Sequence, residues 1–223
     1  MSKKKVTFPH LGSYCVPIEL LFTVGLDTEY ITPPPVTKRT LEIGAKYSPD
    51  LACAPFKYCL GNYIESIEAG ADTLIQTGGV CRLGYYGELH EQILKDLGYD
   101  IQFVNMNASN NLKAISYYND LKEINPNISV KKVAGILPTV FKMVECIDEV
   151  EDYIRKNVGF EIKENAFDNL HKKYLQKLRT VKNKKELKII HSEYMKKFRS
   201  IDTEIPENPL KIGVVGEYYT IME

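Results

Sequence analysis

The chain has 223 residues, of which 44% are hydrophobic, and its 29 Lys and Arg are balanced by 29 Asp and Glu. This composition excludes disorder as the default and fits one large domain or two small ones. A net charge of zero gives no overall attraction to nucleic acid, and no apolar run approaches the length of a membrane span. The basic N-terminus lacks the apolar core of a signal peptide. Because the five cysteines are odd in number, we expect reduced thiols in a cytoplasmic protein.

Short apolar strands alternate with helical segments through the first hundred residues. The expected strands are 5–8, 29–32, 73–77 and 101–104, and the expected helices are 18–26, 37–45, 56–69 and 86–97. Thr37 is a suitable N-cap, Pro55 suits a first helical turn, and Gly70 and Gly98 end their helices. This alternation predicts an α/β domain over residues 1–108, with a Rossmann-like, mainly parallel sheet flanked by helices.

A change of character after Asn105 predicts a mostly helical extension over residues 109–208. Helical patterns cover 112–124 and 133–158. Residues 161–200 then carry 12 Lys or Arg against 5 Asp or Glu, with apolar residues at spacings of three and four. That spacing indicates an amphipathic helix or helix pair, and it favours a solvated packing face over a nucleic-acid interface.

The segment KIGVV at 211–215 has the composition of a buried strand. One strand without its crossover helix is half of a βαβ unit. We therefore expect residues 209–223 to begin a second α/β domain that is truncated at Glu223. The alternative is that this strand joins the edge of the first sheet.

Cys53 and Cys81 are the most informative side chains. They lie in Pro- and Gly-marked segments that should both reach the carboxyl edge of the sheet, where open α/β folds bind their ligands. No C-x-x-C pair exists, which excludes a zinc ribbon or ferredoxin-type run and disfavours a thiol-redox protein. From spacing alone, small core cysteines are favoured over ligands of a cluster or soft metal.

The residues beside Cys81 improve the case for a ligand. Gly78 and Gly79 permit a sharp turn with exposed N–H groups, and Arg82 would favour a thiolate. His10 either contacts a ligand or is a hydrogen-bonded structural residue. Lys57 either meets an anionic ligand or lies on an ordinary helix surface.

The remaining thiols and imidazoles are expected to have ordinary roles. We predict core positions for Cys15 and Cys146, a core or surface position for Cys59, and solvated positions for three histidines, His90, His171 and His191. The chain contains neither G-x-x-x-x-G-K-[ST] nor a G-x-G-x-x-G after its first strand, so nucleotide binding is not supported.

In their order, several motifs resemble a known family. They are VTFPHLGSY, TPPPVTKRTLEIGAKYSPDLACAPFK, LGNYIE and QTGGVCRLGYYGELHEQILKDLGYD, within residues 5–105. Together they resemble proteins related to CoA-substrate-specific enzyme activases, a branch similar to 2-hydroxyacyl-CoA dehydratase subunits and to double-cubane-cluster proteins. KIGVVGEYYTIME resembles the opening of the family's second α/β domain.

This resemblance implies a function. The relatives hold an iron–sulfur cluster, of 4Fe-4S or double-cubane type, through three cysteines, two of which correspond to Cys53 and Cys81. The third ligand comes from the second domain, so a cluster should be absent or incomplete in this chain. Gly78, Gly79, Arg82, His10 and Lys57 would surround it.

The partners implied are an ATP-hydrolysing activase as electron donor, an acyl-CoA substrate and a second subunit in a homo- or heterodimer, with no nucleic acid and no membrane. The activity would be that of a lyase or a low-potential reductase, inactive as this fragment. The alternative function is a non-catalytic α/β module that docks on an activase without a cluster.

Overall fold

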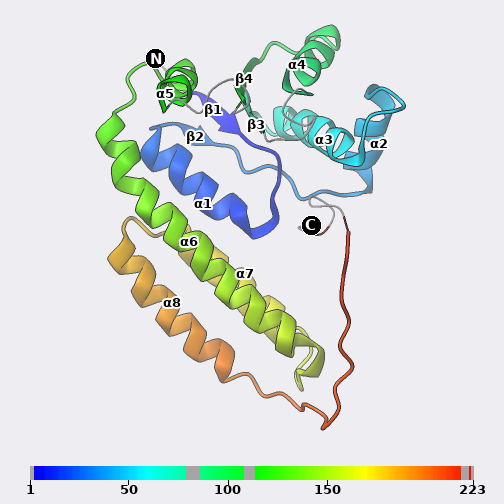
Figure 1. Ribbon diagram of the computed structural model, residues 1–223, viewed down its shortest axis with the longest axis vertical. Helices are drawn as coiled ribbons and strands as arrows, with labels where there is room; N and C mark the ends of the chain where they lie inside the picture. Colours follow the sequence, from blue (N-terminus) through cyan, green and yellow to red (C-terminus); the bar gives the residue numbers. More distant parts are fainter. Residues whose placement is uncertain (1–2, 79–85, 108–113, 217–220, 222–223) are drawn as a thin grey trace.

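A computed structural model describes residues 3–78, 86–107, 114–216 and 221 (Figure 1). Its sheet has four parallel strands in the order β2-β1-β3-β4. The strands are β1 (Lys5–Thr7), β2 (Glu29–Tyr30), β3 (Thr73–Gly78) and β4 (Gln102–Asn107). Val6 of β1 pairs with Tyr30 on one side and Thr73 on the other. The predicted parallel α/β fold is therefore confirmed.

Helices cover both faces of this sheet. After η1 (Gly12–Tyr14), the helices of this half are α1 (Cys15–Leu20), its π-helical continuation η2 (Leu21–Gly25), α2 (Lys38–Tyr47), α3 (Ala54–Glu68), α4 (Tyr86–Asp96) and α5 (Ala114–Ile124). Helices α3 and α4 pack on the face that carries Leu74 and Phe103. Residues of η2 and α5 pack on the face that carries Ile75 and Val104. Neighbouring residues of a strand thus point to opposite layers, as the pleat requires.

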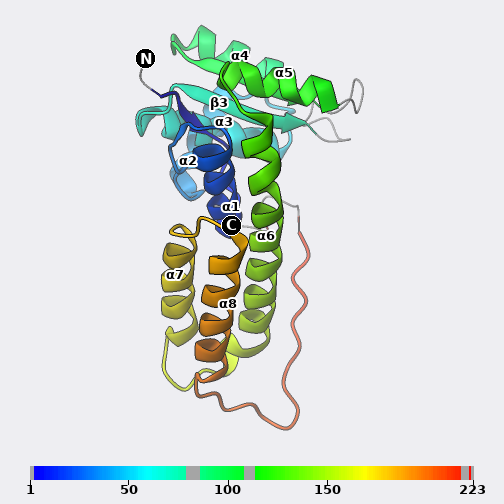
Figure 2. The same ribbon diagram turned by 90° about the vertical axis from the view of Figure 1, so that its left-hand side faces the viewer.

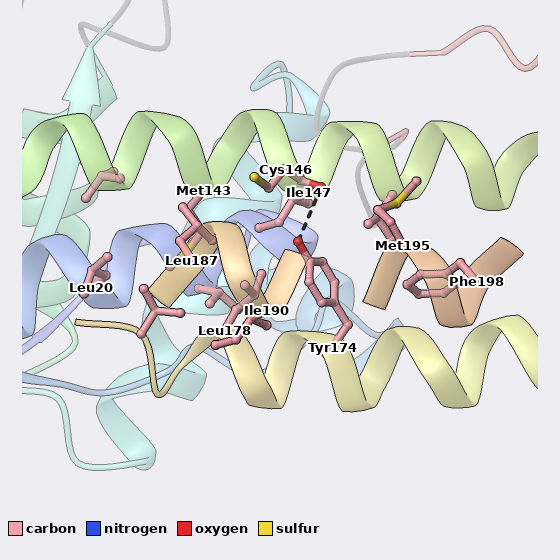
Figure 3. Close-up of a cluster of buried hydrophobic side chains, with 14 of the residues drawn as sticks. Leu20, Met143, Cys146, Ile147, Tyr174, Leu178, Leu187, Ile190, Met195 and Phe198 are labelled. Carbon is pink, nitrogen blue, oxygen red and sulfur yellow. Dashed lines mark hydrogen bonds between the residues drawn. The ribbon is translucent and has the colours of Figure 1, made fainter. Parts of the chain in front are cut away.

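The second half is a bundle of three long helices joined to α1 (Figure 2). They are α6 (Val130–Asn157), α7 (Ala166–Leu178) and α8 (Lys184–Arg199), and the short helix η5 (Val158–Phe160) follows α6. The buried cluster contains Met143 and Ile147 of α6, Tyr174 of α7 and Phe198 of α8 (Figure 3). The expected amphipathic segment is thus a helix pair, and its apolar stripe faces α6 and α1.

The carboxy-terminal segment differs from its prediction. Residues 209–216 are extended and lie away from the bundle (Figure 1). Their four large apolar side chains are exposed: Leu210 (83%), Ile212 (78%), Val214 (78%) and Val215 (96%). The expected buried strand at 211–215 is therefore wrong for this chain. An isolated extended segment has no neighbour to supply ladder hydrogen bonds or cover its side chains.

Candidate functional site

The candidate site lies at the carboxyl edge of the sheet, where the strand order reverses. From β1 the chain passes to β2 on one side, and then through α2 and α3 to β3 on the other side of β1. Ligands of open α/β sheets bind at such a switch point, beyond the carboxyl ends of the strands. The loop after β1 carries His10, and β3 ends at Gly78. Cys53 immediately precedes α3, which returns the chain from this edge to the start of β3.

Asn62 of α3 joins two loops of this edge. Its side chain is 1% exposed. Its Oδ1 accepts a hydrogen bond from the backbone N–H of His10 (2.8 Å), and its Nδ2 donates to the carbonyl of Pro34 (2.8 Å). Both loops lack a neighbouring strand at these points, so one buried amide replaces the missing backbone partners. Sequence reasoning missed Asn62, although a polar residue within the apolar run of α3 is a usable signal.

His10 has a defined tautomer in its neutral form. Its Nδ1 accepts a hydrogen bond from the N–H of Gly12 (3.3 Å). Since a neutral imidazole has one N–H, the proton is on Nε2. The local turn therefore holds the half-buried imidazole ring at the edge of the sheet.

Cys53 is the N-cap residue of α3 and its thiol is exposed. Pro55 occupies the first turn of the helix, as predicted, where it costs no intrahelical hydrogen bond. Lys57 donates from Nζ to the backbone carbonyl of Asp50 (3.3 Å) and so closes the loop before the helix. Cys53 is therefore not the small core cysteine that its spacing alone favours.

Close packing of α2 against α3 fixes the direction of α3. Added Cβ atoms on Gly44 and Gly61 would lie well under 3.0 Å from carbonyl oxygens of the facing helix. Glu65 (6% exposed) accepts hydrogen bonds from Thr40 Oγ1 (2.6 Å) and Arg39 Nη1 (3.0 Å). A buried carboxylate needs this compensation, so the pair of helices forms one rigid support for Cys53.

His90 of α4 lies beneath the edge and is wholly buried, contrary to its predicted solvated position. Its Nε2 lies 3.0 Å from the carbonyl of Phe56, and its Nδ1 lies 2.8 Å from Gln76 Oε1. The ring stacks on Phe56 at 4.0 Å between centroids. Burial lowers the pKa of His90 to about 4, so the ring is neutral at pH 7. Since the carbonyl only accepts, Nε2 carries the proton, and Nδ1 is the nitrogen that lies beside the Gln76 side chain.

The other predicted residues divide into three groups. Gly79, Cys81 and Arg82 fall outside the described residues, so the structure does not place them. Cys15, Cys59 and Cys146 are buried at 3%, 2% and 1% exposure, as expected of core thiols. His171 and His191 are not freely solvated, because their side chains are 21% and 15% exposed and approach Glu151 and Glu149.

Within the described residues, His, Cys, Asp and Glu form no group of three or more that could hold a metal ion. None of the helices described here is long and apolar enough to cross a membrane. No family model, curated protein or solved structure matches this chain.

Proposed function

We propose that the carboxyl edge of this sheet is part of an iron–sulfur site in an electron-accepting protein, with Cys53 and Cys81 as ligands. The position of Cys53 carries the proposal: it is an exposed thiol at the switch point. The other cysteines that the structure describes are buried. Clusters are held by thiolates, and Cys53 fits by ligand type and by access.

Around such a cluster, the N–H groups near Gly78 and Gly79, together with Arg82, His10 and Lys57, would contribute hydrogen bonds and positive charge that tune its potential. When bound, the cluster would supply a low-potential one-electron acceptor. An ATP-hydrolysing activase would be the donor. The protein would act in the cytoplasm as a 2-hydroxyacyl-CoA dehydratase-type lyase or a low-potential reductase, in a homo- or heterodimer that binds an acyl-CoA.

Anaerobic reconstitution of the full-length protein with iron and sulfide tests this proposal. We expect stoichiometric uptake that is lost in both Cys53→Ala and Cys81→Ala. Cys59→Ala is the matched control because its thiol lies in the core. If the unmodified protein takes up no iron, the better interpretation is a non-catalytic module that docks on an activase without a cluster.

We also propose that residues 209–223 begin a second α/β domain that supplies the third ligand. The alternative of a parallel strand beside β4 conflicts with handedness. Helix α4, which connects β3 to β4, packs on the face of Phe103, whereas α5 packs on the opposite face. A parallel strand beyond β4 would then need a left-handed crossover, which is rare. A strand beside β2 would have a partner of only two residues.

Deletion of residues 209–223 tests whether this segment packs on the described fold. Because the large apolar side chains of its described residues are exposed, we expect the melting temperature to stay within about 2 °C of the intact chain. A larger fall in the thermal unfolding midpoint would show that the segment belongs to the first domain.

A further inference from the structure

The helical bundle reaches the candidate site through two polar side chains, Asp148 of α6 and Arg179 at the end of α7. We propose that both are positioning residues, which hold the loops after β1 and β2 in place at the carboxyl edge of the sheet. The functional consequence of this inference rests on the proposed site. The contacts themselves do not depend on the proposed site.

The first contact holds the loop after β1. The hydroxyl of Tyr14 donates a hydrogen bond to Oδ1 of Asp148. Tyr14 ends the short helix η1, four residues after His10. This hydrogen bond has a charged acceptor but is exposed to solvent, and the ring of Tyr14 also packs against the bundle core. Together these contacts let α6 fix the far end of the loop, while Asn62 fixes its start.

The second contact holds the loop after β2. The guanidinium of Arg179 pairs with Glu19 of α1, and its Nη1 lies 3.5 Å from Thr32 Oγ1. Thr32 immediately precedes the Pro33–Pro35 segment. The side chains of Arg179 and Glu19 are 33% and 27% exposed, so solvent screens this pair less than a fully exposed one.

Apolar side chains share this junction with the ion pair of Arg179 and Glu19. A cavity of about 280 Å³ lies between α1 and the turn joining α7 to α8, and its lining includes Glu19, Thr23 and Arg179. Val16 and Leu20 of α1 also line this cavity, and both belong to the bundle core together with Val181. The loops also have apolar anchors: Phe8 and Leu11 pack in the cluster of Ile75 and Val104, Tyr14 packs against the bundle core, and Ile31 packs against the cluster of Leu74. The polar contacts and Asn62 add directional hydrogen bonds to this packing.

Amide hydrogen exchange of the full chain tests the proposal. In Asp148→Ala we expect the amides of residues 10–14 to exchange about three- to ten-fold faster, because one hydrogen bond is lost from the closed state. In Arg179→Ala we expect the same increase at Thr32 and Val36. Amides of β3 and α8 should exchange as in the unmodified protein.

Two controls separate positioning from general destabilisation. Asp152→Ala removes an exposed acid one turn further along α6, where it pairs with Lys156 of the same helix. Tyr194→Phe removes a hydroxyl that donates within the bundle, to the carbonyl of Lys173. Both should leave the loops unchanged. Unchanged loop exchange in the test variants, or an even increase along the whole chain, would overturn the proposal.

A spectroscopic measurement tests whether these residues influence the proposed cluster site. In reconstituted protein, Asp148→Ala should alter the electron paramagnetic resonance signal of the reduced cluster, whereas Asp152→Ala should not. Protein that takes up no iron would refute the proposed function, while the exchange data would still decide whether the bundle holds the loops.

Discussion

His90 shows how one buried side chain can connect three elements. Its imidazole belongs to α4 and meets a carbonyl of α3 and the amide of Gln76 on β3. A charged imidazolium would be costly in this environment, because Phe56 and Tyr63 face the ring with aromatic surfaces. The neutral ring therefore serves as a structural link beneath the candidate site, and its protonation should loosen that link.

The free energy of unfolding should decrease as the pH falls below 6.5. The pKa of His90 is about 4 in the folded chain, compared with 6.5 for an unperturbed histidine. Between these values the unfolded state binds more protons, so acid favours unfolding. The full loss is about 3 kcal/mol, while above pH 7 the contribution is constant. Urea unfolding from pH 7.5 to 4.5 measures the free energy of unfolding of the unmodified chain and of His90→Gln. In the variant, this free energy should depend less steeply on pH. If both proteins lost stability equally with falling pH, the pH dependence could not be assigned to His90.

The sequence pattern of α4 explains why this histidine was misplaced. Leu89, Ile93, Leu94 and Leu97 suggest the buried face, and Leu94 is indeed fully buried, but Leu89 and Leu97 are 37% and 38% exposed. The stripe that is buried runs through Gly87, His90 and Leu94. Hydropathy alone cannot identify a polar residue on such a stripe, because burial depends on partners that are distant in sequence, here Phe56 and Gln76.

At the scale of elements, the α2–α3 pair depends on two glycines that let the helices approach closely. Gly61→Ala should lower the free energy of unfolding by several kcal/mol, on the order of 2–4, because its Cβ would overlap the carbonyl of Thr40. Backbone atoms cannot move aside as a flexible side chain can. Chemical denaturation measures this loss of unfolding free energy, and Gly44→Ala should show a loss of similar size.

Gly135 provides the matched control for these substitutions. It lies inside α6, is exposed, and an added Cβ would meet nothing within 4 Å. Gly135→Ala should therefore raise the free energy of unfolding by about 0.5–1 kcal/mol through helix propensity alone. Equal effects at Gly61 and Gly135 would refute the close-packing explanation.

Local patterns predicted most elements, because strands and helices here follow hydrophobic periodicity and Gly or Pro punctuation. Thr37 and Pro55 stand where the N-cap and first-turn rules place them. The carboxyl-edge placement of His10 and Cys53 followed from the alternation of elements alone. The exposed state of residues 211–215 did not, since a strand is defined by a neighbouring chain and not by its own composition.

At the scale of the whole molecule, one long helix connects the sheet to the bundle. Val133, near the start of α6, packs against the cluster that includes Ile75 and Val104. From Ile136 onward, α6 lies in the bundle cluster, and Val16 and Leu20 of α1 lie in the same cluster. The two cores therefore share covalently continuous helices, and partial unfolding of either would expose the apolar surface of the other.

We expect the sheet and the bundle to unfold in one cooperative transition. Met143→Ala should test this most directly, because Met143 is fully buried in the bundle and its truncation should cost about 2–5 kcal/mol. If the cores are coupled, native-state exchange of Ile75 in β3 and Ile190 in α8 should accelerate by the same factor. Calorimetric and van't Hoff enthalpies should also agree. Faster exchange confined to α8 would show that the bundle unfolds independently, and the loops after β1 and β2 would then lose their anchors before the sheet itself opens.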